Sequence, residues 1–223
     1  MFVSRSHSFV LAVAASAMLV AGNAFAAAIP SNNMLYDIKA GATGGGFTNE
    51  GSWGIVFSVS TPIKVTALGL WDDNSDGFNV SHSVGLWEFG SALKATATID
   101  FLSTIVSSAN TSGQWRFATL STPVILNAGT YTLGYYNTGD DKFYNFAGSN
   151  LIDMPGTTYL NAAARANSNG LVEPDAQGGP SGWIGPNLQA VAVPEVGSIV
   201  MGSIGAAGLL LAARLRRKTS IAK

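Results

Sequence analysis

Residues 53–71 read Trp53-Gly54-Ile55-Val56-Phe57-Ser58-Val59, then Ser60-Thr61-Pro62, then Ile63-Lys64-Val65-Thr66-Ala67-Leu68-Gly69-Leu70-Trp71. The bulkier apolar residues of the first run occupy the odd positions, and Lys64 and Thr66 alternate with apolar neighbours in the second. This alternation is typical of β-strands, because successive side chains point to opposite faces of a sheet. Pro62 stands where a strand would start, and a missing N–H donor costs least there. The stretch therefore predicts two strands separated by a turn.

The same pattern continues toward the C-terminus, through a sequence rich in turn residues. Further strands are predicted at residues 83–89, 92–99, 114–120, 124–126, 131–136 and 185–191, with Pro123 at the start of the 124–126 strand. Residues 145–186 are rich in Gly, Asn and Pro and predict long loops with short strands. Because helix signals are nearly absent before residue 193, we expect residues 27–192 to form one all-β domain, a jelly-roll-like antiparallel β-sandwich.

The N-terminus is typical of a secretory signal. A weakly basic start with Arg5 precedes a stretch, residues 9–20, that is apolar or small throughout. Ala24 and Ala26 then place small residues at the two positions that a signal peptidase reads. Residues 1–26 are therefore predicted to be a signal peptide that directs export through the inner membrane.

The C-terminus predicts a membrane anchor. Residues 196–213 carry no charge, and at about 1.5 Å per residue they form roughly 27 Å of helix, close to the hydrocarbon thickness of a bilayer. A basic stop follows at Arg214, Arg216, Arg217 and Lys218. Positive residues stay inside, so we expect one transmembrane helix, a cytoplasmic tail at residues 219–223 and the domain on the outer side of the membrane.

This ending, with Val193, Pro194 and Glu195 before the span, resembles the PEP-CTERM sorting signal of Gram-negative bacteria. The resemblance covers residues 193–218 and implies recognition by an exosortase, a membrane transpeptidase that cuts near the motif. Val196 stands where that family usually has a second proline. An ordinary anchor that is never cut is therefore the alternative.

A second resemblance covers roughly residues 52–191. The segments Val65-Thr66-Ala67-Leu68-Gly69-Leu70-Trp71-Asp72 and Ser81-His82-Ser83-Val84-Gly85-Leu86-Trp87 look like parts of a β-sandwich domain of unknown function. That domain recurs in secreted and PEP-CTERM bacterial proteins. The resemblance implies a jelly-roll-like fold and an extracellular location, and it implies no catalytic residue.

Composition excludes several classes of function. Residues 27–192 carry twelve Asp and Glu against six Lys and Arg, a net charge of −6, although the whole chain is near neutral at −1. An acidic surface argues against nucleic acid as a partner. The absence of cysteine excludes thiol catalysis, Fe–S clusters and Cys-based zinc sites.

The sharpest local motif is Asp72-Asp73-Asn74-Ser75-Asp76-Gly77. It matches the first half of a calcium loop, in which Asp72, Asn74 and Asp76 would supply converging oxygens. Ser83 occupies the twelfth position in place of a bidentate Glu, so a helix–loop–helix calcium site is rejected. A sandwich loop could still bind Ca²⁺ with Asp140, Asp141 or a backbone carbonyl. The alternative is a polar turn, since Asp, Asn and Gly are common turn residues.

Two further functions, a hydrolase and a carbohydrate-binding module, have some support in the sequence. His82 is the only histidine after the signal peptide, and a hydrolase would pair it with Asp76 or Glu88 and a serine, but no Gly-x-Ser-x-Gly elbow exists. A carbohydrate-binding module would use exposed aromatic rings. The best candidates are in loops or at strand ends: Tyr135, Tyr136, Phe143, Tyr144 and Trp183.

We therefore expect an exported, anchored and sorted protein of the cell surface or exopolysaccharide matrix, without catalytic activity. A carbohydrate-binding module, calcium-dependent or not, is the first alternative, with extracellular polysaccharide as partner. A hydrolase is the second. No cofactor other than Ca²⁺ is expected.

Overall fold

The computed structural model describes residues 33–166, 168–179 and 181–193, which form an all-β fold. All strand pairs among them are antiparallel, so the all-β, antiparallel class predicted from the sequence is confirmed. The strands are β1 Tyr36–Ile38, β2 Gly45–Phe47, β3 Gly51–Val59, β4 Ile63–Asp73, β5 His82–Glu88, β6 Leu93–Ile99, β7 Thr104–Val106, β8 Gly113–Leu126, β9 Gly129–Asn137, β10 Phe143–Ala147, β11 Leu151–Asp153, β12 Thr157–Ala166, β13 Ala176–Gln177, β14 Ser181–Ile184 and β15 Pro186–Ala192. A short 3-10 turn, η1 Gly148–Asn150, precedes β11.

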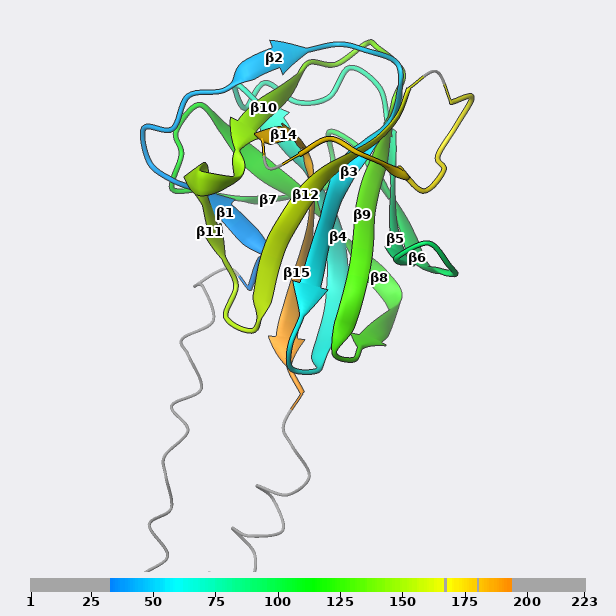
Figure 1. Cartoon of the computed structure of the whole chain (residues 1–223). Helices are drawn as coiled ribbons and strands as arrows, with labels where there is room; N and C mark the ends of the chain where they lie inside the picture. The colour runs from blue at the N-terminus through cyan, green and yellow to red at the C-terminus, as the bar shows by residue number, and fades with distance from the viewer. Residues whose placement is uncertain (1–32, 167, 180, 194–223) are drawn as a thin grey trace, which may run out of the picture.

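Two large sheets form a sandwich-like body. One sheet has the strand order β13-β12-β3-β9-β5-β6 and the other β15-β4-β8-β7. In Figure 1, β4 and β15 lie behind β12, β3 and β9. A three-stranded sheet, β14-β10-β2, lies across the upper end in this view, and the β1-β11 pair lies at one side.

Strand β4 runs from one end of this body to the other. Ile63, its first residue, pairs with Ala192 of β15, and Asp73, its last, pairs with Gly113 of β8. We call the Ile63 end, which is lower in Figure 1, the tail end, and the Asp73 end the pocket end.

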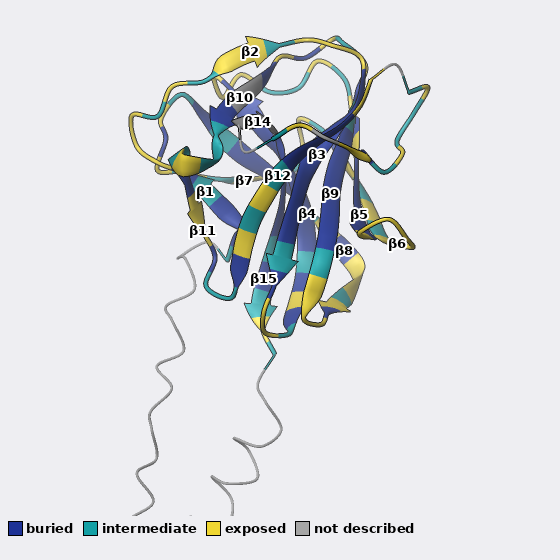
Figure 2. Ribbon diagram, viewed as in Figure 1, coloured by how far each residue is buried: buried dark blue, intermediate teal, exposed yellow. Residues whose placement is uncertain are grey.

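The core is built on the alternation that the sequence shows. Ile55 and Phe57 of β3 are buried, and β3 is paired along its whole length with β9 on one side and β12 on the other. The rings of Trp71 and Trp115 meet edge to face with centroids 5.0 Å apart. Figure 2 shows that β3, β4 and β9 are buried over most of their length, while exposed residues gather in β2, β6 and the connecting loops. Packing of apolar side chains is therefore the main source of stability in this cysteine-free domain.

Most predicted strands are present within one or two residues of their expected bounds, but two predictions are wrong. Segments 114–120 and 124–126 belong to one continuous strand, β8, and Pro123 lies inside it. Val65 pairs with Val124 and Ala67 with Thr119, so residues 120–123 bulge out of the pairing. A residue without an N–H donor is tolerated there.

The second error concerns residues 145–186, where long loops were expected. This region contains β12, a ten-residue strand. β12 pairs with β3 from Thr157–Val59 to Ala166–Gly51, with one irregularity near Asn161. It is therefore an inner strand of the larger sheet.

Several predictions lie outside the described residues. They are the signal peptide with Ala24 and Ala26, the Pro194-Glu195 element, the helix at 196–213, and the basic stop at Arg214, Arg216, Arg217 and Lys218. In the part of the chain that the structure describes, no helix has the length and apolar character needed to cross a membrane.

Candidate functional site

A polar pocket of about 180 Å³ lies at the pocket end of the sandwich. It opens between the loop that follows β4, residues 74–81, and the loop that precedes β10, residues 138–142. Five aspartates and one lysine contribute to its lining: Asp72, Asp73, Asp76, Asp140, Asp141 and Lys142. The two acidic segments considered from the sequence as joint calcium ligands are therefore brought together by the fold.

Asp72 is a structural anchor of this pocket. Its carboxylate is 1% exposed and accepts hydrogen bonds from Arg116 Nε at 2.7 Å and Gln114 Nε2 at 2.8 Å. The backbone N–H of Gly77 donates to its other oxygen at 3.0 Å and closes the loop. Arg116 also donates to the carbonyl oxygen of Phe101 at 2.6 Å. Asp72 is thus fully engaged with protein donors, which explains how a charge is tolerated in a buried position.

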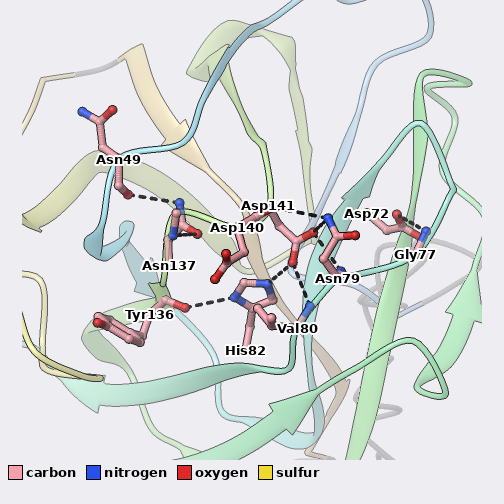
Figure 3. Close-up of polar contacts among 11 residues, drawn as sticks. Asn49, Asp72, Gly77, Asn79, Val80, His82, Tyr136, Asn137, Asp140 and Asp141 are labelled. Carbon is pink, nitrogen blue, oxygen red and sulfur yellow. Dashed lines mark hydrogen bonds and ion pairs between the residues drawn. The ribbon is translucent and has the colours of Figure 1, made fainter.

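Asp141 is the structural anchor of the second loop. One oxygen accepts from the backbone N–H and the side-chain amide of Asn79, at 2.9 and 2.8 Å. The other faces His82 Nε2 at 2.7 Å and the N–H of Val80 at 3.4 Å. Figure 3 shows Asn79 between Asp141 on one side and the Asp72–Gly77 contact on the other. Asp141 therefore ties the two loops together.

His82 is buried and has two oxygen partners. It is 1% exposed; its Nδ1 lies 3.2 Å from the carbonyl oxygen of Tyr136, and its Nε2 contacts Asp141. Its ring lies between those of Phe78 and Phe143, each with a centroid distance of 5.3 Å. Both of these oxygens are acceptors, and each ring nitrogen faces one of them.

This geometry does not form the hydrolase arrangement considered from the sequence. The acidic partner of His82 is Asp141, not Asp76 or Glu88, and neither ring nitrogen contacts a serine among the described residues. Glu88 instead pairs with Lys94 at 2.7 Å. The two ring nitrogens hold the loops in place, a structural role.

The loop that carries Asp140 and Asp141 is fixed at its start by Asn137, which is fully buried. The Asn137 amide donates to the carbonyl oxygen of Asn49 at 3.0 Å and accepts from the N–H of Gly139 at 3.0 Å. Trp53 Nε1 donates to the same Asn49 oxygen at 2.9 Å. The pocket therefore has an ordered frame on both sides (Figure 3).

The predicted calcium ligands do not converge as the motif suggested. Asp72 is engaged with Arg116, while Asn74 and Asp76 are exposed, and Asn74 donates its side-chain amide to Asp73. Within residues 33–193, leaving aside 167 and 180, no three His, Asp or Glu side chains form a ready metal-binding group. The first half of the motif therefore serves mainly to close the loop.

The residue that sequence reasoning passed over is Asp73. Neighbouring residues of a strand point to opposite faces, so Asp73 cannot share the Arg116 contact of Asp72. Asp73 is 7% exposed, and its Oδ1 is buried with no hydrogen-bond partner in the described structure. Burial raises the pKa of its carboxyl above the usual value; the Lys142 ammonium lowers it, and the charges of Asp76 and Asp72 raise it further. The sequence contained a signal for this position, because Asp72 and Asp73 are adjacent at a strand end and their side chains cannot both face outward.

The aromatic residues predicted to stack against a sugar differ in their exposure. Tyr135 and Phe143 are fully buried, with ring centroids 4.3 Å apart, so the prediction that they are available for stacking is wrong. Tyr136 is partly exposed and donates to Glu50 Oε1 at 2.9 Å. The side chains of Tyr144 and Trp183 lie outside the described ones.

A wider groove of about 550 Å³ lies between β6 and β8. It is lined by Thr, Ser, Ala, Leu and Val side chains and by Lys94, and it contains no aromatic ring. Phe78 is the one aromatic residue in the lining of the polar pocket, so the groove offers no ring for sugar stacking and the pocket offers a single one.

Comparison of the chain with protein-family models, with curated proteins and with solved structures finds no match. The resemblances of residues 193–218 and 52–191 to known families therefore rest on their sequence motifs and stay predictions.

Proposed function

We propose that this chain is an exported, non-enzymatic protein of the cell surface or exopolysaccharide matrix. In this proposal a signal peptide directs export, a C-terminal helix anchors the chain, and an exosortase-type transpeptidase processes it at Val193-Pro194-Glu195. The proposal includes the jelly-roll-like strand path, which the two facing antiparallel sheets support.

The observation that carries the proposal is the position of Val193. Its N–H donates to the carbonyl oxygen of Pro62 at 3.1 Å, at the tail end of the sandwich. The Pro194-Glu195 element therefore follows the folded domain without a linker. Since β4 has eleven residues at about 3.3 Å each, the pocket lies roughly 33 Å from this exit point. An anchor after Val193 would hold the pocket end away from the membrane.

The proposed absence of catalytic activity is supported by the engagement of His82, the base that a hydrolase would use. His82 and Asp141 contact each other, and Asp72 is paired with Arg116. A general base needs a nitrogen or oxygen free to take a proton from a substrate. These side chains instead hold the loops, as expected for a binding or scaffold protein.

The test is the C-terminus of the exported protein, read by mass spectrometry. We expect chains that end near residues 193–196, and chains that run to Lys223 in a Glu195→Ala variant. A Val196→Pro variant, which restores the usual family motif, should be processed at least as completely as the wild type. Intact wild-type chains beside a processed Val196→Pro variant would leave a plain anchor and overturn sorting of the natural sequence.

A further inference from the structure

The buried carboxylate of Asp73 lacks a sufficient partner in the described structure. Its Oδ2 accepts a hydrogen bond from the side-chain amide of Asn74 at 3.1 Å, and the Asn74 backbone N–H also lowers its pKa, but its Oδ1 is buried without a hydrogen-bond partner. Asn74 is itself exposed. A carboxylate offers about four acceptor positions, and burial with most of them empty is costly. Asp73 lines the pocket, so a ligand there could reach it.

The charges around Asp73 define the kind of ligand. Asp76 and Asp140 also line the pocket and are exposed, and Lys142 is the single basic residue in its lining. Asp72 forms an ion pair with Arg116, and the Asp141 carboxylate is engaged with His82 and Asn79. Three carboxylates therefore face the charge of one ammonium group, which favours a cation.

We propose that this pocket binds a divalent cation, with Ca²⁺ as the best match, through the carboxylates of Asp73 and Asp76. Ca²⁺ accepts six to eight oxygen ligands in flexible geometry, including amide oxygens and waters. Mg²⁺ demands a strict octahedron and releases its water reluctantly. The pocket lining includes carboxylate, amide and hydroxyl side chains from more than one loop, and such a mixed set of oxygens suits the flexible shell of Ca²⁺ better.

The proposed ligands differ from those that the motif names. Asp72 closes the first loop through the Gly77 N–H, and Asp141 joins the second loop to the first through Asn79. Because few protein carboxylates reach the ion and waters complete its shell, the affinity falls in the weak range of extracellular modules, roughly 10⁻⁴–10⁻³ M. The site does not depend on export or sorting, since it is built only from the folded domain.

The Lys142 ammonium competes with a cation for the negative charge of the pocket, so the test must distinguish the two. Its ammonium lowers the pKa of Asp73 and so acts as a counter-charge in the structure. Its side chain also lies against Gly46, where an added Cβ would meet Lys142 Cε. If Ca²⁺ enters the pocket, it displaces this charge or shares the site with it. Removal of the ammonium should therefore strengthen cation binding.

The experiment uses the full chain, purified in detergent and treated with chelator. Isothermal titration with CaCl₂ and thermal unfolding at matched ionic strength measure binding. We expect Tm to rise with the logarithm of the Ca²⁺ concentration above the dissociation constant. MgCl₂ should act more weakly. Asp73→Asn should weaken Ca²⁺ binding at least about tenfold, and Lys142→Met should strengthen it severalfold.

Asp175→Asn is the matched control, because Asp175 is exposed and paired with Arg165 away from the pocket. It should bind Ca²⁺ as the wild type does. Asp73→Asn should fold normally, since it removes a buried unpaired charge. The proposal is overturned if Ca²⁺ at about 10 mM, well above the expected dissociation constant, has no effect. Equal effects of Ca²⁺ and Mg²⁺, or unchanged binding by Asp73→Asn, would also overturn it.

Discussion

The two ends of the sandwich are built from the same strands but differ completely in charge. The turns at the tail end, residues 60–62, 127–128 and 154–156, contain no charged residue. The pocket end gathers Asp72, Asp73, Asp76, Asp140 and Asp141 from two loops and a strand end. The tail end is closed by short backbone contacts such as Ser60 N–H to the Gly156 oxygen at 2.8 Å. The strands thus fix the body, and the pocket end carries the chemistry.

The energetics of the two ends differ for the same reason. A neutral turn needs only backbone conformation and hydrogen bonds. A buried charge needs a complete set of donors, and removal of one donor leaves an uncompensated ion. The pocket end should therefore be the more sensitive of the two to single substitutions.

The largest effect is expected for Arg116→Ala. It leaves the Asp72 carboxylate buried with only the Gln114 amide and the Gly77 N–H. This should lower the free energy of unfolding by about 3–5 kcal/mol at neutral pH. Urea unfolding followed by tryptophan fluorescence measures it. The control is Lys94→Ala, which breaks the exposed pair with Glu88 and should leave the midpoint nearly unchanged. Equal effects of both changes would remove the distinction between the two ends.

At the tail end, the sensitive position is Gly156. Its φ is +85°, and an added Cβ would lie 2.7 Å from Thr61 Oγ1. Gly156→Ala should cost about 1–2 kcal/mol from the backbone conformation, with a further loss from the clash. Gly41→Ala is the control, because Gly41 has a φ of +72° and open space around it. Thermal unfolding should rank Gly156→Ala below Gly41→Ala, and Thr61→Ala should narrow the gap. Identical losses would show that packing at this turn contributes nothing.

The smallest effect is expected from Asp73 at the pocket end, as a change in how stability depends on pH. Asp73 has a raised pKa in the folded state, so between its usual value of 3.8 and the raised one the folded protein holds more protons than the unfolded chain. The contribution of Asp73 to the free energy of unfolding must therefore fall as pH rises through that window and level off above it. Asp73→Asn in chelator should remove this fall and stabilise the protein by about 1 kcal/mol at neutral pH, a modest value because the pocket admits water.

Urea unfolding across pH 3–7 (the approximate span of carboxyl titration) measures the difference. Asp153, whose pKa burial also raises, is present in both proteins, so their difference isolates Asp73. A wild-type curve that is parallel to that of Asp73→Asn would contradict the assignment of a costly carboxylate at this position.

Sequence reasoning succeeded where side-chain alternation was strong. The runs that became β3, β4, β5 and β9 carry bulky apolar residues at every second position, and that pattern fits only a pleated strand. It failed for β12, because Ala162, Ala163 and Ala164 have low strand propensity and neighbouring Gly and Asn residues suggest loops. Pairing with β3 decided that strand, and pairing is not visible in a local pattern. The bulge around Pro123 was missed for the same reason.

For the site, the sequence locates the acidic motif, but it does not show which of its carboxylates the protein's own donors engage. Asp72 was chosen as a ligand from its position in a spacing pattern. The structure assigns that carboxylate to Arg116, 44 residues away, and leaves the neighbouring Asp73 short of donors. The contact of His82 with Asp141, 59 residues away, was not predicted from the sequence.

By itself, the sequence determined the all-β class, the acidic charge of residues 27–192 and the presence of an aspartate-rich turn. These properties follow from residue order, because alternation, charge count and turn chemistry act over a few neighbouring residues. Only the tertiary structure decided which aspartates are compensated and which one is not. A carboxylate is satisfied by donors that other strands and loops bring to it, and those donors lie tens of residues away along the chain.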